Sequence, residues 1–220
     1  MALQKKDFIE IEFTGKVKDG DVFDSNMQKD LEKLHEGHDH PIEAKPLVFS
    51  LGEGMFLKAV DDFLIGKEIG KYEIELTPEK AFGERISKLV QVIPMKIFQS
   101  QQLRPYPGAV FNFDGRLARV LSVSGGRVTV DFNHPLAGKN VVYEINVLRK
   151  VEDLNEKIKA FMNFLFRRDF NFSIKENKII IEVEKQMSQF IEAFSSKFKE
   201  VFNMDLEVKE IAENTPEKSQ

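Results

Sequence analysis

Hydrophobic and polar positions in the first third of the chain alternate with the two-residue period that is typical of strands. Phe8–Phe13, where Ile9 breaks the rhythm, and Tyr72–Leu76 show this pattern, and the apolar segment Leu47–Leu51 is also expected to be a strand. Asp19-Gly20, between apolar neighbours, predicts a hairpin turn after the first of them. Phe56–Ile65 instead repeats its apolar residues at helical spacing. The polar stretch 24–45 predicts a loop with one helical turn at Asp30–Leu34.

The middle of the chain is rich in strand patterns and differs in charge from what precedes it. Residues 1–86 hold 12 basic and 19 acidic side chains, whereas residues 87–131 hold 6 basic and 2 acidic ones. This change marks a domain boundary and predicts a small β domain. Its expected strands are Val90–Ile93, Ala109–Phe113, Arg116–Val123 and Arg127–Val130, and Val141–Leu148 adds a strand after it.

The last third of the chain changes to helical periodicity. Two helices are expected at Leu154–Leu165 and Met187–Phe202, and three strands at Phe170–Ile174, Lys178–Val183 and Met204–Val208. The order predicts an α-β-β-α-β module. A module of about 65 residues is only marginally stable alone. We therefore expect its Phe-rich faces to be buried against a second copy, which would make a homodimer, or against a client.

Composition excludes several classes of protein. The chain has 220 residues, of which 42% are apolar and 31% charged, as in soluble globular proteins. A net charge of −4 argues against nucleic-acid or anionic-membrane binding. The absence of cysteine excludes disulfides, thiolate catalysis and cysteine-based metal sites. No apolar run reaches the length of a membrane span, and Met1–Asp7 lacks the apolar stretch of a secretory signal, so we expect a cytoplasmic protein.

Motifs for nucleotide, acyl-transfer and zinc-protease chemistry are absent from the sequence. His134 lies in the turn-like segment Asn133–Gly138. A single histidine in a turn is more often structural than catalytic, so no proton transfer is expected from it.

Five short motifs follow one another along the predicted elements: Phe13-Thr14-Gly15, Asp19-Gly20, Phe23-Asp24-Ser25, Leu51-Gly52 and Ala81-Phe82-Gly83. In this order they resemble the core of the FKBP-type peptidyl-prolyl cis-trans isomerases. The basic insert and the segment Asn133–Gly138 are similar to the SlyD-type branch, which carries an insert-in-flap domain. The C-terminal module is similar in architecture to long archaeal members. The resemblance covers about residues 5–150 well, and the rest only by architecture.

The resemblance implies an α+β fold, in which an FKBP-like antiparallel half-barrel surrounds a short helix. The isomerase domain would be discontinuous and consist of residues 1–86 and 132–153. Residues 87–131 would form the β-rich insert-in-flap chaperone domain. Residues 154–220 would form the C-terminal α-β-β-α-β module, which would serve dimerisation or client binding.

The implied function is peptidyl-prolyl cis-trans isomerisation coupled to chaperone activity on unfolded or proline-containing polypeptides. This chemistry suits a chain without an evident nucleophile, because rotation about an X–Pro bond breaks no covalent bond. An apolar pocket disfavours the planar, polar amide more than the twisted transition state. No cofactor is required. The competing hypothesis is a non-catalytic holdase that binds unfolded polypeptide.

The resemblance also assigns residues to the proline pocket. The catalytic group is Phe13, Asp24, Phe82 and Tyr143, and the substrate-binding group is Phe23, Leu47, Phe56, Leu57, Val60 and Leu136. Asp24 would be the polar group at the rim, and Leu57 would donate its backbone N–H to a substrate carbonyl. Taken singly, each apolar member is better explained as a core residue. Their common order along the chain favours a site.

Three positions depart from the family pattern. Phe13 and Phe82 stand where the family has tyrosines, and the missing hydroxyl at position 82 removes a hydrogen bond worth about 0.5–1.5 kcal/mol. Val60 stands where many members, but not the SlyD-like ones, have a tryptophan. We expect a wider, less discriminating pocket and weakened binding of macrolide inhibitors.

Two further features carry functional hypotheses. An apolar set in the insert either binds unfolded clients or forms the insert's own core: Val92, Ile93, Met95, Ile97, Phe98 and Leu103. His35, His38 and His40 place three imidazoles within six residues, a set that suits Ni²⁺ or Zn²⁺. A solvated polar loop explains these histidines better, and metal storage ranks last among the hypotheses.

Overall fold

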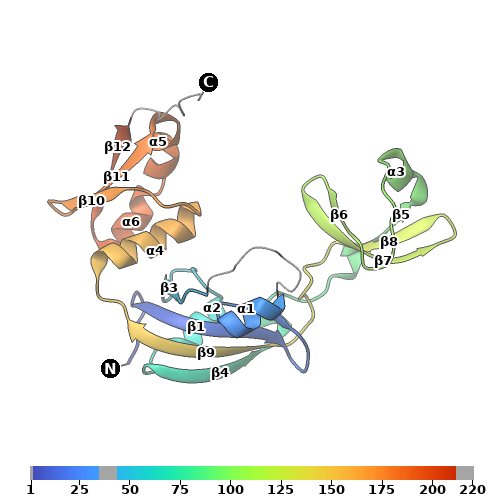
Figure 1. The fold of residues 1–220 in the computed structure, drawn as a ribbon, viewed down its shortest axis with the longest axis horizontal. Helices are drawn as coiled ribbons and strands as arrows, with labels where there is room; N and C mark the ends of the chain where they lie inside the picture. The colour runs from blue at the N-terminus through green and yellow to red at the C-terminus, as the bar shows by residue number, and fades with distance from the viewer. Residues whose placement is uncertain (1, 35–43, 212–220) are drawn as a thin grey trace. The chain divides into compact units, whose positions relative to one another are not determined.

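The computed structural model describes residues 2–34 and 44–211 (Figure 1). The chain divides into two compact units. The first unit consists of Met1–Glu12, Lys45–Lys71 and Asn146–Gln220, and the second of Phe13–Ala44 and Tyr72–Ile145. The borders between the units fall inside three strands of one sheet. The domain boundaries expected after residues 86, 131 and 153 differ from these borders, because they were derived from the sequence motifs, and they stay a prediction.

The sheet that runs through both units has five strands: β1 (Phe8–Val17), β2 (Val22–Ser25), β3 (Leu47–Ser50), β4 (Gly70–Leu76) and β9 (Val141–Lys150). Its order is β2-β1-β9-β4, and β3 also pairs with β1. β1 is antiparallel to both β2 and β3. The accompanying helices are α1 (Gln28–Leu34), α2 (Lys58–Leu64) and a 3₁₀ turn at Pro78–Lys80. The fold is therefore mixed α+β, and α1 is longer than the single turn that the sequence predicts.

The start of β1 is buried on both faces, which explains why its alternation breaks at Ile9. Phe8 and Ile9 are 3% and 0% exposed. Successive strand residues point to opposite faces, so these two side chains enter different cores. Phe8 belongs to the core of the C-terminal module, where its ring stacks on Phe202 with the centroids 5.7 Å apart.

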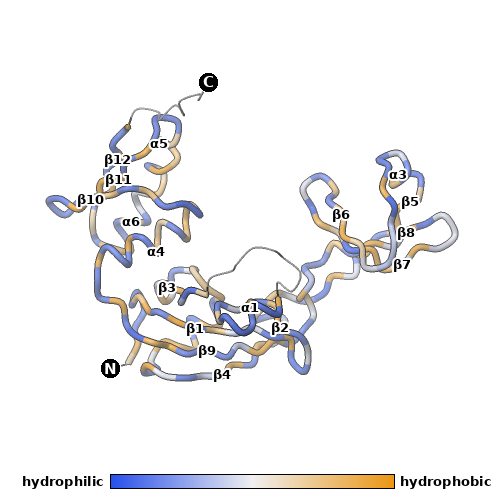
Figure 2. Tube along the Cα trace, viewed as in Figure 1, coloured by the Kyte–Doolittle hydropathy of each residue, from blue (hydrophilic) through white to orange (hydrophobic). Residues whose placement is uncertain are grey.

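The insert is a four-stranded antiparallel sheet in the order β5-β8-β7-β6. Its elements are a 3₁₀ turn (Ser87–Leu89), β5 (Val90–Pro94), α3 (Met95–Ser100), β6 (Val110–Phe113), β7 (Arg116–Ser124) and β8 (Arg127–Asp131). Figure 2 shows orange apolar and blue polar positions mixed along these strands, as expected for a sheet with one packed face. The strand predictions are confirmed, but the sequence pattern did not indicate α3.

Phe98 on α3 closes the core of the insert and is fully buried. Its ring packs edge-on against Phe111 and Phe113, with the centroids 5.6 Å away in both cases. Three other members of the expected client-binding set, Ile93, Met95 and Leu103, pack against the same core. Only Val92 and Ile97 of that set are exposed, at 58% and 43%. Phe98 thus serves the insert's own core, and no client can reach it in this structure.

The C-terminal module contains α4 (Leu154–Phe166), β10 (Phe172–Lys175), β11 (Lys178–Glu184), α5 (Lys185–Glu192), α6 (Ser195–Phe202) and β12 (Asp205–Ile211). β11 lies between β10, which is antiparallel to it, and β12, which is parallel to it. Asp153 caps α4 by accepting a hydrogen bond from the Glu156 N–H at 2.8 Å. None of the helices in residues 2–34 and 44–211 has the length and apolar character needed to cross a membrane.

The second helix expected in this module is two helices, so the prediction of one continuous helix is wrong. α5 ends before Ala193, and Phe194 precedes α6 with a backbone of φ −92° and ψ 4°. The Ser195 hydroxyl donates to the Glu192 carbonyl at 2.6 Å. Serine side chains compete in this way with the regular hydrogen bonds of a helix, which the apolar periodicity does not reveal.

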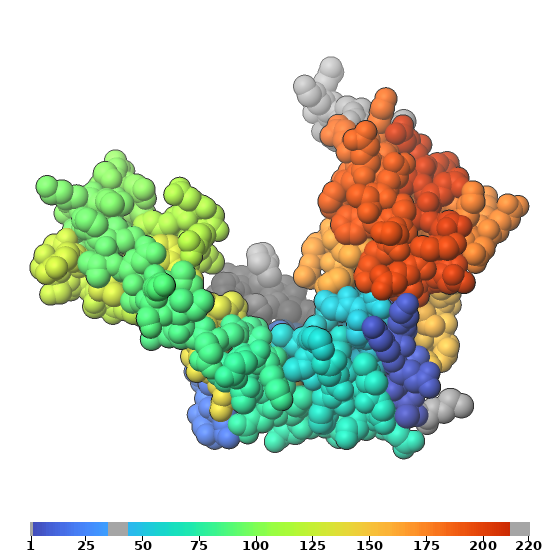
Figure 3. Space-filling view, turned by 180° about the vertical axis from the view of Figure 1, so that it is seen from behind, coloured from blue at the N-terminus to red at the C-terminus, as the bar shows by residue number. Residues whose placement is uncertain are grey.

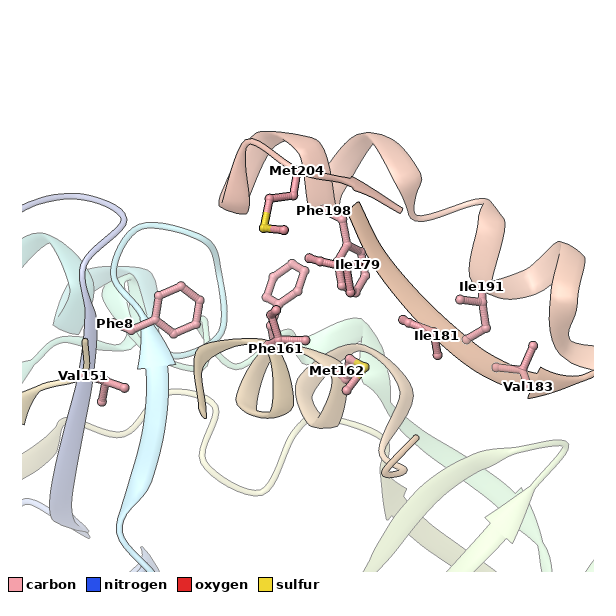
Figure 4. Packing of buried hydrophobic residues seen from close by; sticks show 11 residues of the cluster. Phe8, Val151, Phe161, Met162, Ile179, Ile181, Val183, Ile191, Phe198 and Met204 are labelled. Atoms are coloured by element: carbon pink, nitrogen blue, oxygen red, sulfur yellow. The ribbon is translucent and has the colours of Figure 1, made fainter. Parts of the chain in front are cut away.

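All three helices and the sheet of the module bury their apolar faces in one core (Figure 4). Phe161 on α4 lies edge-on to Phe198 on α6 at 5.2 Å, and Ile179 and Ile181 come from β11. Phe8 and Val151 belong to the same core although they lie outside the module in sequence. In Figure 3 the dark blue N-terminal segment lies against the red part of the module, where the Lys6 ammonium donates to the Glu200 carbonyl at 2.9 Å.

Replacing Phe98 by Ala should unfold the insert or leave it largely molten. Truncating a buried Phe costs roughly 3–5 kcal/mol, a large share of what so small a domain can supply. Hydrogen exchange at the amides of residues 90–131 measures the effect. Ile97→Ala, one position away on the exposed side of α3, is the matched control and should change exchange little. Equal acceleration of exchange in both variants would contradict this description of the core.

Candidate active site

Four aromatic side chains of the second unit form one cluster. Phe23 on β2 packs edge-on against Tyr143 on β9 and against Phe82, with centroid distances of 5.8 and 5.6 Å. Phe13 on β1 lies tilted against Tyr143 at 6.2 Å. Edge-to-face pairs of this kind are favourable beyond the apolar area they bury. The structure therefore brings together four residues that the sequence motifs assigned to the proline pocket.

A glycine makes this close packing feasible. The register between β1 and β2 shifts at Gly15 and Lys16, which is a β-bulge. A Cβ at Gly15 would lie 2.9 Å from the Phe23 ring and 3.0 Å from the Tyr143 ring. Any larger residue would displace both rings, so the Thr14-Gly15 motif is explained by the aromatic cluster above it.

Short hydrogen bonds fix the position of Phe13. Its N–H donates to the Asn26 side-chain oxygen at 2.7 Å, and its carbonyl accepts from the Ser25 hydroxyl at 2.9 Å. The Thr14 hydroxyl donates to the Asp30 carboxylate on α1 at 2.6 Å. The sequence motifs did not single out Asn26 or Asp30. Asn26 directly follows β2, and Asp30 lies in the first turn of α1. Polar residues at these positions could have indicated the two hydrogen bonds from the sequence.

Asp24 and Tyr143 give the cluster its polar groups. The Asp24 side chain is exposed, yet partial desolvation of its carboxyl raises its pKa, against a hydrogen bond from the Ser25 N–H. Burial raises the pKa of the Tyr143 phenol, and the nearby Asp24 carboxylate raises it further. Tyr143 therefore keeps its proton at physiological pH, and its hydroxyl remains a donor.

His134 extends the aromatic surface from Phe82. The two rings stack at 4.9 Å with only 3° between their planes. The His134 Nδ1 accepts a hydrogen bond from the Leu136 N–H at 3.2 Å, and the Gly138 N–H donates to the Gly83 carbonyl at 2.8 Å. The segment after the insert is thereby held beside Phe82, and half-buried Leu136 lies within it.

The two chain segments that lead into and out of the insert are joined by polar groups. The Asn133 side chain accepts from the Ile86 N–H at 2.8 Å and donates to the Ile86 carbonyl at 3.0 Å. The Arg85 guanidinium donates twice to one Asp131 oxygen, at 2.7 and 3.1 Å. Burial alone would raise the pKa of Asp131, but the hydrogen bonds from Asn133 and Arg85 lower it. This clamp gives Asn133 a structural role.

Four of the expected substrate-binding residues lie in the first unit. Val60 on α2 is fully buried, and Phe56 packs against Phe49 at 5.4 Å. Leu47 begins β3, and Leu57 precedes α2 in an extended conformation. Within the described residues the Leu57 N–H donates to no acceptor. The prediction that these residues share a pocket with the aromatic cluster of the second unit stays a prediction.

The three histidines proposed for metal binding, His35, His38 and His40, lie outside the described residues. Within residues 2–34 and 44–211, no group of three or more His, Asp or Glu side chains is arranged to hold a metal ion.

Known protein families match the chain in the regions where these features lie. A model for the FKBP-type peptidyl-prolyl cis-trans isomerases matches residues 1–103, and a model for the "FKBP26, IF domain" matches residues 91–136. The short-type peptidyl-prolyl cis-trans isomerase of Methanocaldococcus jannaschii is 30% identical over 146 residues, which are 66% of this chain and 92% of that protein. The chain belongs to the FKBP-type peptidyl-prolyl cis-trans isomerase family.

Bacterial members show a similar degree of likeness to this isomerase. The FKBP-type 16 kDa peptidyl-prolyl cis-trans isomerase of Escherichia coli K12 is 30% identical over 153 residues, covering 67% of this chain and 93% of that protein. The FKBP-type peptidyl-prolyl cis-trans isomerase SlyD of Helicobacter pylori is 28% identical over 144 residues, covering 64% and 70%. The sequence motifs and the comparisons thus indicate the same family, and the activity of that family is peptidyl-prolyl cis-trans isomerisation.

A buried carboxyl lies next to Val60 in this isomerase. Asp61 is 2% exposed, and one of its oxygens accepts from the Gly52 N–H at 2.9 Å. The other oxygen has no hydrogen-bond partner in the described part of the chain. Burial raises the pKa of Asp61 to about 6, against the effect of the Gly52 hydrogen bond. An ionised Asp61 at neutral pH therefore lowers the stability of the fold.

Asp61→Asn should stabilise the isomerase at pH 7 and have little effect at pH 4. The folded state keeps the Asp61 proton up to about pH 6, whereas an unfolded Asp loses it near pH 4. The stability that this proton contributes is fully present below pH 4 and is lost as the pH rises through 6. The free energy of unfolding should fall by on the order of 2 kcal/mol over this range. Asn keeps an oxygen for Gly52 and cannot ionise.

Urea unfolding at both pH values measures the difference, and Asp62→Asn, an exposed neighbour on α2, is the control. A gain in Asp61→Asn that is the same at pH 4 and pH 7 would contradict the assignment.

Proposed function

We propose that this isomerase is a folding catalyst. It binds unfolded client segments on its insert and catalyses cis–trans isomerisation of their X–Pro bonds in the aromatic cluster. The observation that carries the proposal is the position of His134. Its ring stacks on Phe82 of the cluster, and it also lines a pocket against the insert. One residue therefore borders both a surface that suits a proline ring and a surface that suits a client chain.

The proposed isomerisation site consists of Phe13, Asp24, Phe82 and Tyr143 as the catalytic group, with Phe23, Leu47, Phe56, Leu57, Val60 and Leu136 around the substrate. Apolar rings disfavour the planar amide, whose resonance gives it a large dipole, relative to the twisted transition state. Asp24 and the Tyr143 hydroxyl offer the polar contacts that orient the peptide. The Leu57 N–H, which has no acceptor within the described residues, suits a substrate carbonyl.

The proposed client site is a pocket of about 470 Å³ in the second unit. The exposed residues of β6 and β7, the end of β8 and the segments before and after the insert supply most of its lining, and buried Ala118 completes it. The lining residues are Arg85, Val110, Leu117, Ala118, Arg119, Leu121, Asp131, Asn133, His134, Pro135, Ala137 and Lys139. Val110, Leu117 and Leu121 are 57%, 65% and 40% exposed. Such large apolar side chains on the outer face of a sheet suit an unfolded chain with exposed apolar groups.

Charge gives this pocket a preference. Arg119 and Lys139 form no ion pair within the described residues, whereas Arg85 is engaged by Asp131. Two unpaired cations beside apolar side chains complement a segment in which an acidic residue neighbours apolar ones. We therefore propose acidic, apolar client segments as the preferred ligands of the pocket.

Several finer parts of the assignment extend this proposal. The five-stranded sheet with α2 would be the FKBP-like half-barrel, the insert an insert-in-flap domain, and the whole chain a SlyD-like long archaeal type. The C-terminal module would bind a second copy or a client through its remaining exposed apolar residues, of which Phe190 is 51% exposed. Light scattering on the full chain and on a Phe190→Glu variant would test the dimer.

The coupling of capture to catalysis predicts that Leu117→Ser impairs protein refolding but not the isomerisation of a short peptide. Burying one Leu contributes about 1.5–3 kcal/mol, so affinity for an unfolded client should fall by roughly ten- to a hundred-fold. The measurement compares the cis-to-trans rate of an X–Pro tetrapeptide with the refolding rate of a protein limited by proline isomerisation.

Arg119→Glu tests the charge preference in the same assay. It should weaken an acidic client more than a neutral one, and more so at low salt. Lys96→Glu, an exposed charge reversal on α3 outside the pocket, is the matched control. If refolding follows the peptide rate in every variant, capture and catalysis are not coupled through this pocket. If suppression of aggregation persists without any effect on the peptide rate, the protein is a holdase.

A further inference from the structure

The loop Leu51–Leu57 joins β3 to α2 and ends at Phe56 and Leu57, two residues proposed for the proline pocket. The C-terminal module contacts this loop within the first unit. The contact comes from α6, whose residues lie about 140 positions further along the chain. It connects a part of the chain with no assigned role in catalysis to a part that is proposed to bind substrate.

The central contact is an ion pair between Glu53 and Lys197. The Lys197 ammonium lies 2.7 Å from a Glu53 carboxylate oxygen, and the Glu53 side chain is only 2% exposed. A buried carboxylate is costly unless a cation and hydrogen bonds compensate its charge. The hydrogen bond to Glu53 raises the pKa of Lys197, which therefore stays charged. Lys197 also lies 3.1 Å from Glu200, which holds the ammonium from the solvent side.

The same loop has a second anchor in the module. The Met55 side chain packs against the module's apolar core, and its sulfur accepts from the Ser50 N–H at 3.3 Å. Met55 directly precedes Phe56, so its packing limits where the Phe56 backbone can lie. Glu53 and Met55 thus fix the second half of the loop from the module.

The first half of the loop is fixed without the module. The Leu51 carbonyl accepts from the Lys6 N–H at 2.9 Å, and the Gly52 N–H donates to Asp61. Between the two halves, Gly54 has a φ of +72° and no atom within 4 Å of the position of a Cβ. The turn at Gly54 is open to solvent. The segment that leads to Phe56 and Leu57 is held by the contacts of Glu53 and Met55 with the module, in addition to the packing of Phe56 on Phe49.

We infer that Lys197 is a positioning residue of the isomerase, which acts through Glu53 to hold the loop that presents Phe56 and Leu57 to the substrate. The inference rests on the proposed assignment of these two residues to the proline pocket. It gives the C-terminal module a role in catalysis on each single chain, independent of any second copy. Lys197 itself touches no substrate, so its effect is on peptide affinity more than on the turnover of bound peptide.

Lys197→Met in the full chain tests the inference. The variant removes the cation and leaves the Glu53 carboxylate buried and unpaired. We expect KM for an X–Pro tetrapeptide to rise by about five-fold or more while kcat changes less, since small displacements of binding groups have large effects. Lys197→Arg, which keeps the charge and a donor, should restore most of the affinity.

The matched control is Lys199→Met on the same helix. Lys199 pairs with exposed Asp205 inside the module, at 2.8 Å, and its loss changes the net charge equally. This control should leave KM unchanged. If Lys197→Met does not fold, Glu53→Gln replaces it, and the amide signals of Phe56 and Leu57 in nitrogen-15 spectra report whether the loop has moved relative to Lys199→Met.

Each remaining result overturns the inference in a different way. Equal KM values for Lys197→Met, Lys199→Met and the wild type, with all three folded, would show that the ion pair does not position the pocket. Phe56→Ala separates this failure from a failure of the proposed site. If Phe56→Ala raises KM and Lys197→Met does not, only the positioning role is wrong. If neither raises KM, the assignment of the loop to the pocket is wrong, and the inference falls with it.

Discussion

The packing of Phe23 between Tyr143 and Phe82 is the contact on which the second unit depends. It requires a glycine at position 15, because a Cβ there would overlap both the Phe23 and Tyr143 rings. It also requires the bulge that shifts β1 against β2 at that glycine. Once these rings are packed, Phe82 presents a face on which His134 stacks, and the segment after the insert is held beside the cluster. The aromatic contact thereby positions both the candidate catalytic residues and one wall of the pocket that is proposed to bind clients.

Buried charge organises the loop of the first unit in two different ways. Glu53 is compensated by an ion pair with Lys197 from the C-terminal module, whereas Asp61 accepts a hydrogen bond from Gly52 and forms no ion pair within the described residues. The first arrangement connects the loop to a distant part of the chain, and the second makes the stability of the same region depend on pH near 6. Burying two carboxylates so close to a candidate substrate loop is costly. Both carboxylates hold the loop, Glu53 through Lys197 and Asp61 through the Gly52 N–H.

Much of this arrangement follows from the sequence. The resemblance carried by the motifs around Phe13, Phe23 and Phe82 implies a pocket lined by these rings. Alternation predicts most strands, because it depends only on residues that are close in sequence. The break between α5 and α6 was missed because the apolar periodicity continues through it, and the Ser195 hydroxyl bond to the Glu192 carbonyl leaves no mark in that pattern. The role of Phe98 was ambiguous because an apolar side chain looks the same whether a core or a client covers it. The Glu53–Lys197 pair joins residues 144 positions apart, and no local pattern indicates such a contact.

The most direct test of the central claim is to observe where a substrate proline binds while it isomerises. Exchange spectroscopy of an X–Pro peptide with a catalytic amount of the protein would show cis–trans exchange, and intermolecular nuclear Overhauser effects would locate the proline ring. We predict exchange peaks together with contacts from the proline ring to the rings of Phe23, Phe82 and Tyr143. Exchange without those contacts, or contacts only with the insert, would contradict the account.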